Sequence, residues 1–131
     1  MTDVQQQTPY TLMGGEKGVL SLVERFYFYM DTLPEAKELR AIHAPDLSSA
    51  KDKLFKFLSG WLGGPDLFIQ QYGHPRLRQR HFSFKVNQQV RDQWVFCMRK
   101  AVYEIAMPDE VRKNIKQAID DLATHMINAD S

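Results

Sequence analysis

Apolar residues recur every three or four positions along most of this chain, and no stretch alternates apolar with polar residues over any length. In the segment from Glu16 to Met30, the apolar positions are Val19, Leu20, Val23, Phe26, Tyr27 and Met30. That spacing gathers the apolar side chains on one face of an α-helix, whereas a half-buried strand would repeat at every second residue. The sequence therefore predicts an all-α protein.

Glycine and proline divide the chain into separate helices. The clearest stops are Gly14-Gly15 and Gly63-Gly64-Pro65, because glycine readily ends a helix and proline cannot continue one. A helix capped by Asp46 or Ser48 is predicted before the second stop. Its apolar face would comprise Leu47, Ala50, Leu54, Phe57, Leu58 and Trp61.

Two further long helices follow in the second half of the chain. Asn87 is a good cap for a helix that would run to about Ala106, with a buried face made of Val90, Trp94, Cys97, Met98, Ala101 and Ile105. Pro108 suits the start of the last helix, in which the apolar positions are Val111, Ile115, Ile119, Leu122 and Met126. Shorter helical pieces are predicted over residues 10–13, 33–42, 66–71 and 75–81.

A chain of 131 residues has the usual size of one domain. We expect a polar, flexible N-terminal segment over residues 1–9 and a single domain over residues 10–128. The formal net charge of +1 argues against a dedicated nucleic-acid binder. The lone Cys97 excludes an internal disulfide and fits a reducing compartment. No apolar run is long enough to cross a bilayer and no signal segment is visible, so we expect a cytoplasmic protein without a membrane partner.

The segment 72–84, YGHPRLRQRHFSF, contains the residue with the most specific chemistry. His81 stands between a basic stretch and two aromatic residues, Phe82 and Phe84. A neutral imidazole is a good ligand for a transition metal, and a histidine is the usual proximal ligand of haem iron in globins. The alternative for His81 alone is a solvated histidine. His74, at the edge of the predicted helix, is expected to be exposed and to bind no iron.

Four blocks of sequence together resemble the group II truncated haemoglobins, which are two-over-two helical globins. The blocks are Arg25-Phe26-Tyr27, the segment 57–65 (FLSGWLGGP), the segment 72–81 (YGHPRLRQRH), and Arg91-Asp92-Gln93-Trp94 followed by Cys97-Met98. They occur in the family's order and at its separations, over nearly the whole chain. The resemblance implies a two-over-two sandwich of helices around haem b, with residues 10–128 forming a single globin domain.

The resemblance also assigns roles to individual residues. His81 would be the metal ligand on the proximal side. The set in contact with the cofactor would be Lys53, Leu54, Phe57, Arg80, His81 and Phe84. From their positions in the sequence, Arg80, next to His81, could pair with one haem propionate, and Lys53, three residues beyond Ala50, with the other. The distal, ligand-binding set would be Tyr27, His43, Ala50, Leu54 and Trp94. For Tyr27 and Trp94 the alternative is a packed core aromatic whose polar group is satisfied elsewhere.

His43 departs from the family pattern, because much of the family has tyrosine or phenylalanine where the chain enters the distal loop. His43 could donate to the ligand or to Tyr27, could bind the iron itself, or could be only a loop residue. Its presence predicts ligand binding that changes between about pH 5 and 8, the range in which histidine titrates.

The resemblance implies a haem protein that binds oxygen, nitric oxide and carbon monoxide. Two strong distal donors favour retention of the ligand, which suits nitric oxide dioxygenase-like or peroxidase-like chemistry better than bulk transport. Either reaction would need an unidentified reductase. One alternative is a haem-based gas or redox sensor that acts through a partner protein. Another is a cofactor-free helical module that binds nucleic acid through Arg76, Arg78 and Arg80, which the near-neutral charge disfavours.

Overall fold

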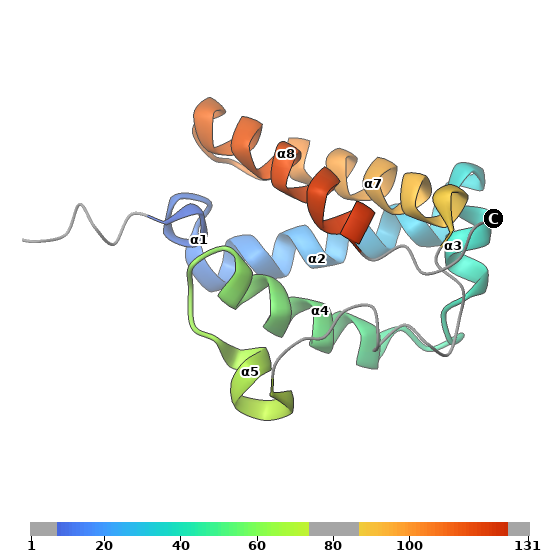
Figure 1. Cartoon of the computed structure of the whole chain (residues 1–131), viewed down its shortest axis with the longest axis horizontal. Helices are drawn as coiled ribbons and strands as arrows, with labels where there is room; N and C mark the ends of the chain where they lie inside the picture. Colours follow the sequence, from blue (N-terminus) through green and yellow to red (C-terminus); the bar gives the residue numbers. More distant parts are fainter. Residues whose placement is uncertain (1–7, 74–86, 126–131) are drawn as a thin grey trace, which may run out of the picture.

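The computed structural model describes residues 8–73 and 87–125, and the described part is helical without strands (Figure 1). This confirms the predicted all-α class. The elements are α1 (Pro9–Leu12), α2 (Gly15–Thr32), the 3-10 helix η2 (Pro34–Ala36), α3 (Lys37–Ala41), α4 (Ser48–Trp61), α5 (Leu67–Tyr72), α7 (Gln88–Tyr103) and α8 (Asp109–His125). None of these helices is both long enough and apolar enough to cross a membrane.

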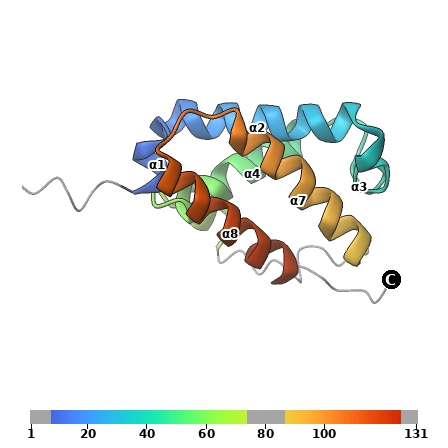
Figure 2. The same cartoon turned by 90° about the horizontal axis from the view of Figure 1, so that it is seen from above.

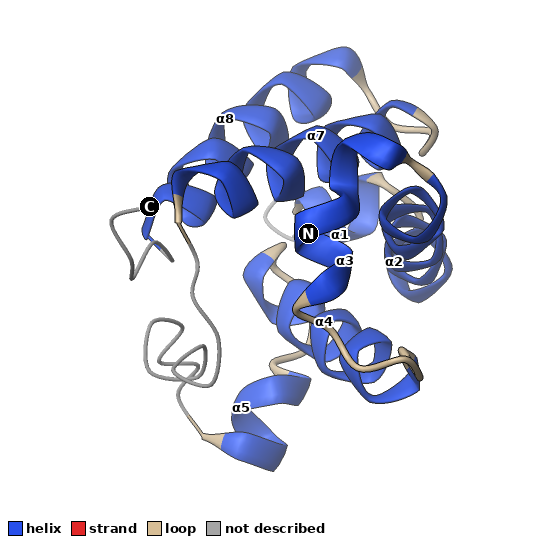
Figure 3. Ribbon diagram, turned by 90° about the vertical axis from the view of Figure 1, so that its right-hand side faces the viewer, coloured by secondary structure: helices blue, strands red, loops and turns tan. Residues whose placement is uncertain are grey.

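Four helices form two stacked pairs. Helix α2 packs on α4 to make one pair, and α7 packs on α8 to make the other. The two pairs meet through α2 and α7, so α2 lies between α7 and α4 (Figures 1 and 2). The short helix α3 joins α2 to α4 and contacts α7 at one end of the stack, as the view of Figure 3 also shows.

The two helices at the centre of the stack carry most of the core. Helix α2 buries Gly18, Val19, Leu22, Val23, Phe26, Tyr27 and Met30, and α7 buries Val90, Val95, Cys97, Met98, Ala101 and Val102. The predicted apolar face of α2 is thereby confirmed except at Leu20, which is exposed. In α7, Trp94 is partly buried and packs against the core, and Val95, which was not predicted, is buried as well.

The helix ends agree with the sequence prediction at one site and differ at others. Asn87 caps α7 as predicted, its side-chain oxygen accepting the Val90 N–H at 2.9 Å. However, α7 ends at Tyr103 rather than near Ala106. At the start of α4, Asp46 accepts the Ser48 N–H at 2.9 Å, but the cap position itself is Leu47, which makes no side-chain cap. Helix α1 begins at Pro9 with Thr8 as its cap.

The glycine pair after α4 allows α1 to approach closely. The Tyr10 N–H donates to the Leu62 carbonyl at 2.9 Å, which joins α1 to the end of α4. A Cβ on Gly64 would lie 2.6 Å from the Tyr10 ring, and a Cβ on Gly63 would lie 2.6 Å from the Thr8 Cβ. Gly63 also has a φ of +97°, which other residues rarely adopt. The stop at residues 63–65 is therefore also a packing site for α1.

We predict that Gly64→Ala destabilises the protein by about 1–3 kcal/mol, because the added methyl group overpacks the contact with Tyr10. The midpoint and slope of urea unfolding would measure the change. If the clash is with the ring, the loss caused by alanine should be smaller in a Tyr10→Leu background than in the wild type. An unchanged unfolding midpoint in Gly64→Ala would show that the Tyr10 ring does not rest on this glycine.

Candidate haem-binding site

Tyr27 is buried in the face of α2 that packs into the core, with only 5% of its surface exposed. Burial raises the pKa of its hydroxyl well above the ordinary value of 10.0 for tyrosine, because the phenolate would lose its hydration. The hydroxyl therefore keeps its proton at every physiological pH. A protonated phenol can donate a hydrogen bond to a ligand that carries negative charge.

A chain of aromatic contacts joins three of the predicted distal residues. Phe26 is fully buried, and its ring lies edge-on to Tyr27 at 4.9 Å and to Trp94 at 5.6 Å between centroids. On the other side of Tyr27, the His43 ring lies at 6.1 Å with an interplanar angle of 78°. Edge-to-face arrangements of this kind are the favourable ones for aromatic rings. The structure thus gathers Tyr27, Trp94 and His43 from three different elements into one corner.

The hydrogen bond of His43 decides which ring nitrogen carries the proton. Its Nδ1 lies 2.9 Å from the Leu39 carbonyl oxygen, which can only accept. The neutral ring must therefore carry its proton on Nδ1, which leaves Nε2 as an acceptor. A neutral His43 can accept from the Tyr27 hydroxyl through Nε2 but cannot donate to a ligand through that atom. Donation through Nε2 requires the protonated ring.

Helix α4 presents an apolar face that the described chain covers only partly. Its two buried residues are Leu58 and Ser59. The predicted pocket residues Ala50, Leu54 and Phe57 are partly buried and pack against the edge of the core. An amphipathic helix normally buries such a face, so this one has apolar surface available for a further group. Apolar surface of this kind is what a flat apolar cofactor such as haem requires.

Lys53 is exposed on α4, with its amine 5.8 Å from the centre of the Tyr72 ring. The pairing of Lys53 with a haem propionate stays a prediction. The other predicted cofactor residues, Arg80, His81 and Phe84, lie outside the described residues. The same is true of His74 and of the arginines at 76 and 78.

Two polar residues that the sequence analysis did not single out hold the distal corner together. Gln93, next to Trp94 on α7, accepts the Leu39 N–H at 2.9 Å and donates to Glu38 at 2.8 Å. These contacts tie α3 to α7, and the bond from Gln93 is the main reason why the pKa of Glu38 is lowered. The second residue is Arg40, whose contacts reach the loop after α3. In the sequence, Gln93 lay within a recognised block, whereas nothing marked Arg40.

Cys97 is fully buried in α7. Burial raises the pKa of its thiol to about 11, with a smaller contribution from Glu35. The thiol is therefore protonated under physiological conditions and unreactive. This agrees with the expectation that Cys97 fills space in the core.

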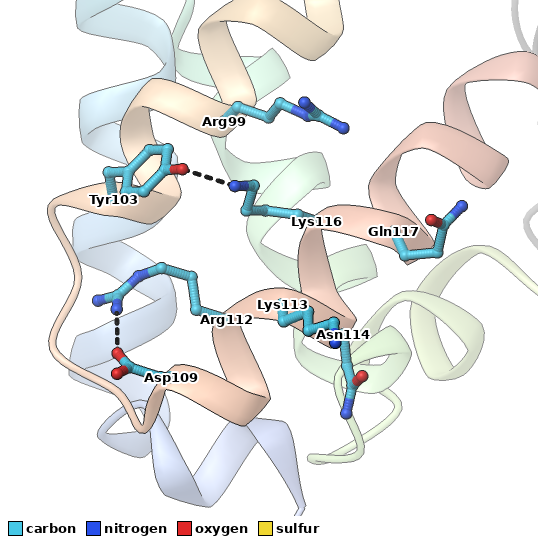
Figure 4. Close-up of a pocket in the computed structure, with 8 residues that line it drawn as sticks. All are labelled: Arg99, Tyr103, Asp109, Arg112, Lys113, Asn114, Lys116 and Gln117. Atoms are coloured by element: carbon cyan, nitrogen blue, oxygen red, sulfur yellow. Dashed lines mark hydrogen bonds and ion pairs between the residues drawn. The ribbon is translucent and has the colours of Figure 1, made fainter.

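A pocket of about 560 Å³ lies between α7 and α8 and is lined by charged and polar residues (Figure 4). Its cationic side chains are Arg99, Arg112, Lys113 and Lys116. Three of these make contacts within the protein: Lys116 donates to the Tyr103 hydroxyl at 2.6 Å, Arg112 pairs with Asp109 at 3.3 Å, and Arg99 pairs with Asp120. The charged side chains of this pocket contrast with the aromatic rings around Tyr27.

The stacked helix pairs and the apolar corner with its hydroxyl, indole and imidazole groups define a two-over-two globin fold. Comparison with known proteins agrees. The family model described as bacterial-like globin matches residues 8–128. The chain belongs to this family, and within it to the group II truncated haemoglobins. Family membership implies a haem cofactor and the binding of diatomic gases.

Individual relatives show how far the similarity extends. A cold-adapted truncated haemoglobin of the Antarctic marine bacterium Pseudoalteromonas haloplanktis is 46% identical, with a TM-score of 0.90 over 94% of this chain and 99% of that one. The group II 2-on-2 haemoglobin of Agrobacterium tumefaciens is 43% identical, with a TM-score of 0.89 over 92% and 94%. The group 2 truncated haemoglobin YjbI of Bacillus subtilis is 33% identical over 92% of this chain and 88% of its own length.

Tyr27 and Tyr103 provide a direct test of the two environments. Hydrogen bonding from Lys116, followed by the charges of Lys116, Arg99 and Arg112, lowers the pKa of Tyr103 below 10.0, whereas burial raises that of Tyr27. In a tyrosine titration followed by ultraviolet difference spectra, Tyr103→Phe should therefore remove a residue that ionises early. Tyr27→Phe should remove one that ionises last. Loss of an early-ionising group in Tyr27→Phe would show that this phenol is solvated.

Proposed function

We propose that this protein binds oxygen and other diatomic ligands at the iron of haem b, with His81 as the proximal ligand and Tyr27 and Trp94 as distal donors. When bound, ferrous haem takes up such a ligand and shifts negative charge onto it. The observation that supports the proposal is the buried, protonated hydroxyl of Tyr27, joined to Trp94 through the ring of Phe26. An indole N–H can only donate, so both groups favour a ligand with negative charge.

The strength of the two proposed hydrogen bonds indicates whether the protein would transport the ligand or react with it. A hydrogen bond to a charged group contributes about 1.5–3 kcal/mol, so two independent donors would slow release by roughly a hundred- to ten-thousand-fold. A carrier has to release its ligand, whereas an enzyme benefits from retaining it. We therefore propose that the protein converts bound oxygen rather than transporting it. Nitric oxide and dioxygen would give nitrate, and a separate reductase would return one electron to the oxidised cofactor. Reduction of hydrogen peroxide to two water molecules would instead consume two electrons and two protons, which an electron donor would have to supply.

The side chains around the cofactor would divide the remaining tasks. Leu54, Phe57 and Ala50 would supply apolar walls that exclude water from the distal side. Lys53 on α4 would pair with one propionate, and Arg80 with the other. A neutral His43 would compete with the ligand for the single proton of the Tyr27 hydroxyl, whereas a protonated His43 would leave that proton to the ligand and become a third donor.

We predict that Tyr27→Phe and Trp94→Phe each accelerate oxygen release by roughly ten- to a hundredfold, because each removes one donor to a charged ligand. Stopped-flow measurement of oxygen dissociation from the ferrous protein would show this. Tyr29→Phe is a matched control, because Tyr29 lies on the same helix but contacts Arg25 and Lys100 at the surface. Unchanged rates in both distal variants would place the donors elsewhere.

We predict that His81→Gly abolishes stable haem uptake, because it removes the only proposed protein bond to the iron. The purified variant should lack the strong visible absorption of a haem protein, and added imidazole should restore it by filling the vacated ligand position. His74→Gly, seven residues earlier in the same segment, should retain haem. Normal haem content in His81→Gly would contradict the ligand assignment.

A further inference from the structure

Arg40, at the end of α3, makes more contacts than a simple surface ion pair would require. Its Nε donates to Asp31 at 2.8 Å. One Nη atom donates to the carbonyl of Ala44 at 3.0 Å and, more weakly, to that of His43 at 3.5 Å, and the other donates to the carbonyl of Pro45 at 3.0 Å. The planar guanidinium has five N–H donors in a fixed arrangement, which is the property that these contacts use.

These contacts connect helix α2, which carries Tyr27, with the loop that carries His43. Asp31 lies one helical turn beyond Tyr27 on α2, and the three carbonyls belong to the loop that begins with His43. The backbone also folds back here, since the His43 N–H donates to the Arg40 carbonyl at 3.1 Å. The side chain of Arg40 therefore bridges the helix of Tyr27 and the loop of His43.

The exposure of these groups shows which contacts matter. The Arg40 side chain is 26% exposed and Asp31 is 56% exposed, so the ion pair alone contributes little. The bonds to the loop carbonyls occupy backbone acceptors that no helix satisfies. A loop whose carbonyls are all bound to one rigid side chain has few other conformations available.

We propose that Arg40 is a positioning residue for His43. By holding the loop 43–45 against α2, it keeps the imidazole Nδ1 on the Leu39 carbonyl and the ring against Tyr27, and so sets how His43 acts on the bound ligand. This inference rests on the proposed function, because it requires His43 to act on the ligand. Lysine cannot replace arginine here, because its single Nζ atom cannot reach an acceptor on α2 and two carbonyls of the loop together.

The first experiment compares oxygen dissociation from the ferrous protein in the wild type, Arg40→Lys, His43→Phe and the double variant, between pH 5 and 8. Arg40→Lys should change the rate by about two- to tenfold and flatten its pH profile, and it should have no further effect in the His43→Phe background. Besides His43, the ionisable side chains in this corner are Tyr27, Asp31, Lys37, Glu38, Arg40 and Asp46. When the wild type is compared with Arg40→Lys, every one of these side chains except Arg40 is the same in both proteins.

Two controls separate positioning from general stability. Arg112→Lys is matched to Arg40→Lys, because Arg112 also pairs with a carboxylate, that of Asp109, and donates to a backbone carbonyl, that of Ile105 at 2.8 Å. However, it does so at the start of α8 and in the linker before it. It should leave both the rate and the pH profile unchanged. Asp31→Asn removes the charge of the anchor on α2 and so weakens it, and it should produce a smaller change of the same sign. It provides a second variant if Arg40→Lys folds poorly.

A second measurement does not depend on ligand kinetics. Nitrogen-15 NMR of the His43 ring in the diamagnetic, carbon monoxide-bound protein should show the neutral ring protonated at Nδ1 in the wild type. In Arg40→Lys, the two neutral forms should be mixed. A ring that remains fully Nδ1-protonated in Arg40→Lys would overturn the proposal.

The kinetic outcomes separate this proposal from the proposed function. If Arg40→Lys has the same effect with and without His43, or has no effect while His43→Phe does, then Arg40 does not position His43 and the distal function stands. If Tyr27→Phe, Trp94→Phe and His43→Phe all leave the rate unchanged, the distal function fails. The role of Arg40 toward the ligand then fails with it.

Discussion

The packing of α2 between α4 and α7 is the constraint on which the rest of the structure depends. Because α2 contacts a helix on each side, it needs a wide apolar arc, and the adjacent residues Phe26 and Tyr27 are both buried in it. Burial of Phe26 places its ring between Tyr27 and Trp94. The positions of Tyr27 and Trp94, the proposed distal donors, are therefore a consequence of core packing.

Local patterns in the sequence predicted those parts of the fold that local interactions determine. The apolar period of three and four identified α2, and the capping side chain of Asn87 identified the start of α7, because both signals act within one or two helical turns. The end of α7 was predicted three residues too late. The Glu104 and Ile105 N–H groups instead close turns onto Ala101 and Val102, and Ile105 remains buried beyond the helix. A buried residue just past a helix end extends the apolar pattern without extending the helix.

The polar part of the candidate site could not be predicted in the same way. Gln93 reaches Leu39 across 54 positions of sequence, and Arg40 reaches back nine positions to Asp31. No local pattern distinguishes an arginine that binds loop carbonyls from one that faces solvent. Comparison with the family pattern pointed to Tyr27, His43 and Trp94. In the structure, Tyr27 lies against His43 and is joined to Trp94 through Phe26. The resemblance gave no information on the side chains that hold them in place.

The tautomer of His43 shows how a single backbone acceptor can limit the chemistry of a site. Because the Leu39 carbonyl accepts from Nδ1, the remaining nitrogen of the neutral ring, Nε2, is an acceptor. The ring of Tyr27, whose hydroxyl can donate, lies next to the His43 ring. A phenol that donates to His43 is less available to a ligand, whereas protonation of the ring frees the phenol and adds a donor. The two residues would then respond to pH together, provided that the ring keeps its orientation. In this structure, the orientation depends on α3 being held to α7 by Gln93 and to α2 by Arg40, so the pH response of the distal side would originate in contacts that do not touch the ligand.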